Sequence, residues 1–135
     1  MTDIITWVKI AFAGLCGVFS YIFGGFDTML KILIAMMVID YLTGISAAVY
    51  RKELCSRTGF NGLLKKAVIL CIVACGHLLG DMMGVSEIRY TVIGFYIANE
   101  GISIIENAAD LGVPLPQKII DILDKIKEEE DDNDL

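Results

Sequence analysis

Long apolar stretches with few charges occupy most of this chain. Four of them have the length of a membrane span, at residues 4–23, 28–50, 66–84 and 88–110. A helix needs about 20 consecutive, mostly apolar residues to cross a bilayer, and a helix satisfies its own backbone hydrogen bonds in lipid. The first and third stretches lack the charged face that helices of soluble bundles carry. The pattern predicts an all-α integral membrane protein with four transmembrane helices within residues 1–112.

The first stretch has two possible placements, so the number of spans is four or, alternatively, three. One side of this expected helix is small and only weakly polar, with Thr6, Lys9, Ala13, Gly17, Ser20 and Gly24. Such a face suits close packing against another helix inside the membrane. It also suits a helix that lies on the outer surface of the bilayer. We prefer the spanning placement.

After the last apolar stretch the pattern changes to a short amphipathic one. Apolar residues recur at helical spacing, at Ile119, Ile120, Leu123 and Ile126. Two prolines precede them, as is common where a helix begins. We therefore expect an amphipathic helix within residues 113–127, on the membrane surface or against its neighbours. The remaining residues, 128–135, are nearly all acidic and predict a solvated, disordered tail.

Composition sharpens this picture because the charge is unevenly distributed. The 135 residues are 56% hydrophobic and 21% charged, with a net charge of −6. From residue 117 onward there are eight acidic and three basic residues, so the body of the chain is almost neutral. Such a chain is not expected to bind nucleic acid, which requires a basic surface.

Basic residues between the second and third stretches predict the orientation. The connection at residues 51–66 contains Arg51, Lys52, Arg57, Lys65 and Lys66 and a single acidic residue. The connections near 24–27 and 81–89 contain only one basic residue, Arg89. Cytoplasmic loops are enriched in Lys and Arg. We therefore expect the 51–66 loop and the C-terminus on the cytoplasmic side, with the loop against anionic lipid head groups.

Acidic and amide side chains interrupt the second and fourth stretches. Asp40 and Glu100 lie near the middle of these segments, where each ionised acid costs about 2.5–3.5 kcal/mol on insertion scales. On a helical wheel the fourth segment carries a polar stripe with its flanking residues: Tyr96, Asn99, Glu100, Ser103, Glu106, Asn107 and Asp110. The stripe either packs inside one subunit or lines a water-filled space between several subunits. We prefer the second, with Asp40, Thr43 and Gly44 contributing, because one small subunit offers little interior.

Glycines at four-residue intervals mark the third segment, at Gly76, Gly80 and Gly84. Small residues at this spacing let helices approach closely. The contact can lie within the subunit or between copies in a homo-oligomer, and the spacing does not separate the two. In the same segment, Cys71, Cys75 and His77 lack the spacing of a metal knuckle, so no metal site is expected.

The chain shows no motif of a known enzyme class. A phosphate-binding glycine loop, a nucleophile elbow and a paired-histidine zinc motif are all missing from the sequence. The sequence therefore predicts a protein that is not an enzyme and needs no cofactor.

Two blocks in this sequence resemble the phage-lysis and toxin-secretion holin family of Gram-positive bacteria and their phages. The first is Asp40-Tyr41-Leu42-Thr43-Gly44, followed by a basic loop with two glycines. The second is YIANEGISIIENAADLGVPLP at residues 96–116. The resemblance extends over roughly residues 27–125. The first expected helix carries little of it.

The resemblance implies a small protein that oligomerises in the bacterial cytoplasmic membrane. It implies lesions that release an endolysin or a large toxin without a stable complex with that cargo. The leading hypothesis is therefore a holin whose lesion is lined by the polar stripe. The alternative is a small proton-coupled transporter or another small membrane channel, which would also use a carboxylate within the membrane.

Overall fold

The computed structural model describes residues 1–133, and all regular secondary structure in that range is helical. The helices are α1 (Thr2–Phe23), α2 (Thr28–Tyr50), α3 (Ser56–Met83), α4 (Glu87–Asp110) and α5 (Gln117–Asn133). The predicted all-α class is confirmed.

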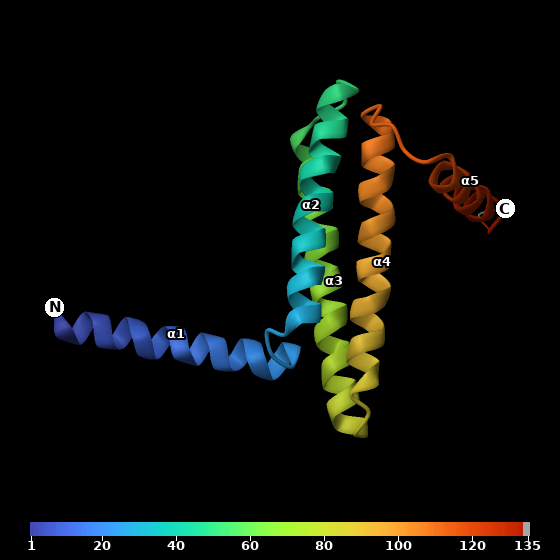
Figure 1. Cartoon of the computed structure of the whole chain (residues 1–135). Coiled ribbons are helices and arrows are strands. Elements are labelled where there is room, and N and C mark those ends of the chain that lie inside the picture. Colours follow the sequence, from blue (N-terminus) through green and yellow to red (C-terminus); the bar gives the residue numbers. More distant parts are fainter. Residues whose placement is uncertain (134–135) are drawn as a thin grey trace.

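Helices α2, α3 and α4 form a bundle in which α3 runs antiparallel to α2 and α4 (Figure 1), and α4 packs closely against α2 and also against α3. The core of the bundle is small: Leu30, Leu33 and Met37 come from α2, Val73 from α3 and Ile93 from α4. Many apolar side chains on the outside of the bundle remain exposed, Val38 and Leu42 of α2 among them. An apolar exterior around a narrow core is what a helical bundle presents to lipid.

Helix α1 projects away from the bundle, crosswise to it, and none of its residues is buried. It meets α2 at an elbow formed by Gly24 and Gly25, whose φ angles are +79° and +104°. Residues other than glycine rarely adopt such angles, so this elbow depends on the glycine pair. Helix α5 projects from the opposite end of the bundle, on the side of α4.

Three helices in the described range, α1, α2 and α3, are long and apolar enough to cross a membrane. Helix α4 has a sufficient length of 24 residues, but it carries several charged side chains, which lower its hydropathy. The apolar helices indicate a membrane location. The prediction of a fourth span at 88–110 depends on where the charges of α4 lie.

Helix α3 begins at Ser56, ten residues before the expected start at residue 66. The expected 51–66 loop is therefore wrong for most of its length. Two glycines made this segment look like a loop, but both lie within α3, beside Tyr41 of α2. A Cβ added at Gly59 would lie 3.4 Å from the hydroxyl oxygen of Tyr41, and one at Gly62 would lie 3.5 Å from its ring, both at ordinary contact distance.

Helix α5 starts directly after Pro116 and continues past the expected end at residue 127 to Asn133. Glutamate is a good helix former, so the acidic run can extend the helix. Leu123 and Ile126 belong to the predicted apolar stripe, but their side chains lie outside the described part of the chain. Residues 134–135 of the predicted tail also lie outside it.

Two of the three regularly spaced glycines of α3 face α4 of the same subunit. A Cβ at Gly76 would lie 3.1 Å from a methyl group of Val92, and one at Gly80 would lie 2.6 Å from the carbonyl oxygen of Val85. Gly84 instead ends α3 with a φ of +70°. Of the two alternatives left open by the spacing, packing within the subunit accounts for Gly76 and Gly80.

Candidate functional site: a charged cluster between three helices

Lys66 of α3 lies between two carboxylates from the other two helices of the bundle. Its Nζ is 2.6 Å from Oδ2 of Asp40 on α2 and 2.6 Å from Oε2 of Glu100 on α4. The exposed fractions of the three side chains are 15%, 14% and 6%, respectively. The two acids near the middle of the predicted spans are therefore paired inside one subunit. A buried carboxylate is tolerated when a hydrogen-bonded cation compensates it.

Asn107 extends this cluster along α4 towards the α2–α3 connection. Its Nδ2 donates to Oδ1 of Asp40 at 3.1 Å, to the carbonyl oxygen of Asp40 at 3.2 Å and to Oγ1 of Thr43 at 3.0 Å. Gly44 also lies beside this amide, because a Cβ there would be 3.5 Å from the same nitrogen, an ordinary contact distance. The structure thus brings Asp40, Thr43 and Gly44 of α2 together with Asn107 of the polar stripe predicted on the fourth helix.

The predicted stripe residues do not all share one environment. Glu100 is buried, and Tyr96, Ser103, Glu106 and Asn107 are partly buried. Asn99 is exposed, and Asp110 is exposed at the end of the helix. We expected a single subunit to have too little interior for this stripe. That expectation underestimated the space between the three helices, where Glu100 finds a partner on α3 and Asn107 finds partners on α2.

The basic residues expected to set the orientation fall into two groups, those that form ion pairs and those that do not. Lys66 belongs to the charged cluster, and Arg51 Nη1 pairs with Asp110 Oδ2 at 2.8 Å. Lys52, Arg57 and Lys65 are exposed. At or near the α2–α3 connection, the basic end of the bundle therefore keeps three exposed positive charges that form no ion pair with a described side chain.

A cavity of about 570 Å³ lies beside the charged cluster. All three bundle helices line it: Asp40, Lys66 and Glu100 belong to the cluster, whereas Asn61 and Lys65 of α3 are exposed. One side of the cluster is therefore reachable from outside the bundle.

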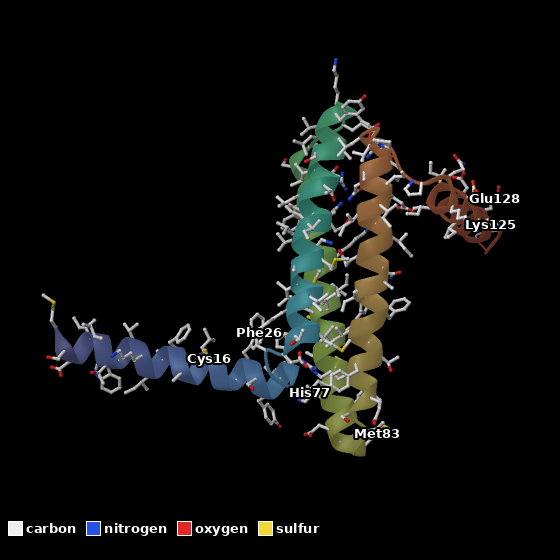
Figure 2. The ribbon with its side chains drawn as sticks, in the orientation of Figure 1. Cys16, Phe26, His77, Met83, Lys125 and Glu128 are labelled. Carbon is white, nitrogen blue, oxygen red and sulfur yellow. The ribbon has the colours of Figure 1, made fainter. Side chains whose placement is uncertain are left out.

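The sequence reasoning missed a second polar contact, at the opposite end of the bundle. Arg89 of α4 is only 5% exposed. Its Nε donates to the carbonyl oxygen of Phe23 at 2.6 Å, and Nη2 donates to that of Gly25 at 3.2 Å. Both Nη atoms also reach the carboxylate of Asp27, at 2.7 and 3.0 Å. Arg89 thereby holds the α1–α2 elbow against α4, near His77 (Figure 2).

Asp27 is the group at the elbow whose ionisation this contact changes. The hydrogen bonds from Arg89 hold the pKa of Asp27 below its usual value, and partial burial opposes this shift. Asp27 also caps α2, because its Oδ1 accepts a hydrogen bond from the backbone N–H of Leu30 at 3.1 Å. The sequence signal for this contact was that Arg89 is the one basic residue within the connections near 24–27 and 81–89.

A family model for the bacteriophage holin family matches residues 17–128, which include the whole bundle and both polar contacts. The chain belongs to the bacteriophage holin family. Among its relatives, a probable holin of Bacillus phage phi105 is 35% identical over 116 residues, which cover 85% of this chain and 83% of the relative. An uncharacterized 14.9 kDa protein of Clostridium perfringens is 40% identical over 88% of this chain and 92% of its own.

Another relative of this holin-family protein, an uncharacterized protein of Listeria innocua, is 39% identical over 86% of this chain and 84% of its own. No solved structure matches the chain. The family assignment confirms the resemblance found in the sequence. It suggests a membrane protein without enzymatic activity. The matched range omits most of α1, in keeping with the low resemblance of that segment.

Proposed function

We propose that this holin-family protein oligomerises in the bacterial cytoplasmic membrane and opens lesions that release an endolysin or a large toxin. The observation that carries the proposal is the charged cluster of Asp40, Lys66 and Glu100 at the centre of the bundle. Its polar groups satisfy one another in a closed subunit. In a larger assembly the same groups can face water.

We propose that α4 crosses the membrane together with α2 and α3. Its length of 24 residues is sufficient, and its charged groups have partners. Glu100 pairs with Lys66, Arg89 with Asp27 and Asp110 with Arg51. Paired charges that face a bundle interior are tolerated in membranes. The basic α2–α3 connection and the C-terminus then lie in the cytoplasm, and the α1–α2 elbow lies at the outer side.

Helix α1 is placed differently from the three helices of the bundle. Its crosswise direction supports the three-span alternative with α1 near the outer surface. Its nearly uniform apolar surface, with Trp7 and Phe12 about two-thirds exposed, requires contact with lipid or with another subunit. We therefore propose three spans, α2 to α4, with α1 embedded beside them at the outer side.

Lesion formation would require α4 to turn its polar stripe away from α2. Breaking a buried ion pair costs about 3–5 kcal/mol when one partner is left without compensation. Contacts between subunits and hydration of the stripe would have to offset this cost. The cluster would thus set a barrier that delays lysis until enough subunits have accumulated.

The test is expression of the full chain in a bacterium that also makes a cytoplasmic muralytic enzyme. A holin should produce sudden growth arrest, loss of membrane potential and lysis that requires the enzyme. Cells that keep their membrane potential and do not lyse would refute the proposal. If such cells also became drug resistant, the proton-coupled transporter would be the better explanation.

A matched pair of variants separates the role of the cluster from that of the other residues of the polar stripe. Glu100→Gln with Asn107→Leu removes two members of the cluster and should shift the onset of lysis. Glu106→Gln with Asn99→Leu makes the same chemical changes on the same helix outside the cluster and should leave the onset near that of the wild type. Equal onset times for the two double variants would remove the cluster from the mechanism.

A further inference from the structure

The cavity beside the charged cluster has the size of a ligand site. Its volume of about 570 Å³ falls within the range of roughly 300–1,000 Å³ that small-molecule sites occupy. The proposed function uses the cluster itself and leaves the cavity without a role.

The charges that line the cavity are separated along it. At the inner side, two carboxylates and one ammonium group, those of Asp40, Glu100 and Lys66, leave one formal negative charge in excess. Nearer the exposed surface, Lys65 supplies one positive charge, and it makes no ion pair with any side chain that the structure describes. Asn61 adds an exposed amide on the same helix, one turn earlier. The cavity thus has a negative inner part and a positive outer part.

The position of the cavity relative to lipid follows from α3. Its residues 56–66 are largely polar or basic, and its continuous apolar run starts at Ala67. The cavity therefore extends from the level of Asp40 and Glu100, near the middle of α2 and α4, towards the polar end of α3, which is cytoplasmic in the proposed topology. Ile45, Leu54 and Ile69 give the cavity apolar walls, which can accept part of an acyl chain.

We infer that this cavity binds an ethanolamine phosphate group, with its ammonium at Asp40 and Glu100 and its phosphate at Lys65 and Asn61. The ligand must carry a positive and a negative charge a few atoms apart, to match the inner and outer parts of the cavity. A phospholipid with this head group and free phosphoethanolamine share the chemistry.

Other common head groups match the cavity less well. A phosphoglycerol head group carries only negative charge and would place no cation beside the excess carboxylate. A phosphocholine head group has the right charges, but its quaternary ammonium has no N–H to donate to Asp40 or Glu100. Charge-assisted hydrogen bonds are about twice as strong as neutral ones, so the ethanolamine group gains most from this site.

The test uses the full-length protein in nanodiscs that contain equal amounts of phosphatidylethanolamine, phosphatidylglycerol and phosphatidylcholine. The lipid that stays bound after release from the nanodisc is identified by native mass spectrometry. The wild type should retain phosphatidylethanolamine preferentially. Lys65→Gln should reduce that retention roughly tenfold, because a charge-assisted contact is lost, and Lys65→Arg should keep it. Arg57→Gln, an exposed basic residue of α3 that does not line the cavity, is the matched control and should retain the lipid.

The inference is overturned if the wild type retains the three lipids equally. It is also overturned if Lys65→Gln and Arg57→Gln retain phosphatidylethanolamine alike. Circular dichroism of each variant verifies that the helices have formed. Added phosphoethanolamine identifies the source: displacement of the lipid shows that the head group suffices, and retention shows that the acyl chain contributes. Because lysis is not measured, failure here would leave the proposed function untouched.

Discussion

Replacing Lys66 with Met is the sharpest test of how the bundle is held together. The substitution keeps the length and most of the apolar volume of the side chain but removes the ammonium group. Asp40 and Glu100, whose side chains are 14% and 6% exposed, would then face each other without a cation. Removing one partner of a buried pair typically destabilises a protein by about 3–5 kcal/mol. At 1.4 kcal/mol per factor of ten, the ratio of folded to unfolded protein should fall between about a hundredfold and a few thousandfold.

The assay is unfolding of the full-length protein in mixed micelles as the fraction of denaturing detergent rises, with helicity followed by circular dichroism. Lys118→Met makes the same substitution at an exposed lysine of α5 and should change stability by less than about 0.5 kcal/mol. In a double variant, Glu100→Gln combined with Lys66→Met removes one of the two uncompensated carboxylates. Part of the lost stability should return, with a coupling of at least about 1 kcal/mol.

A stability of Lys66→Met equal to that of Lys118→Met would refute the reasoning, because it would mean that the ion pairs contribute nothing to the bundle. If the changes in unfolding free energy of Lys66→Met and Glu100→Gln simply added in the double variant, the specific role of Glu100 would be refuted. In the lysis assay, Lys66→Met should advance the onset, because the closed arrangement of the subunit is weakened.

Three further predictions address other parts of the molecule. Asp27→Asn should remove the stability that the contact with Arg89 gives at neutral pH. Since this contact lowers the pKa of Asp27 in the folded protein, the stability advantage of the wild type should be complete above about pH 3.9, the pKa of an unfolded Asp, and should disappear as the pH falls through the lower pKa of the folded state. Acid unfolding of both proteins measures this difference. Gly80→Ala should destabilise the bundle by about 1–3 kcal/mol, because the added Cβ would collide with backbone. Gly94→Ala is the control: an added Cβ there has no other atom within 4 Å, so the change should be neutral or slightly stabilising. Both are measured in the same detergent titration. Cys55, as the only cysteine retained, should react with a membrane-permeant maleimide in whole cells but not with an impermeant one, and labelling by both would place the α2–α3 connection outside.

The amino-acid sequence by itself determined the fold class and the ends of most helices. A long apolar stretch in lipid forms a helix because a helix satisfies its backbone hydrogen bonds within the segment. The elements predicted at 28–50 and 88–110 match α2 and α4 within one residue. The start of α3 could not be predicted, because Gly59 and Gly62 favour a loop when only local preference is considered. In the structure both lie within α3 and beside Tyr41 of α2, a tertiary contact that no local pattern encodes.

The sequence also identified the unusual polar residues, among them Asp40, Glu100 and Asn107, because charges and amides in apolar segments need a reason. Only the tertiary structure decided what that reason is within one subunit. Lys66 is 26 and 34 residues away from its two partners and resembled one more basic residue of a cytoplasmic loop. Which side chains neutralise one another depends on how α2, α3 and α4 rotate and align. That arrangement follows from packing across the whole bundle, so it cannot be derived from the periodicity of any single helix.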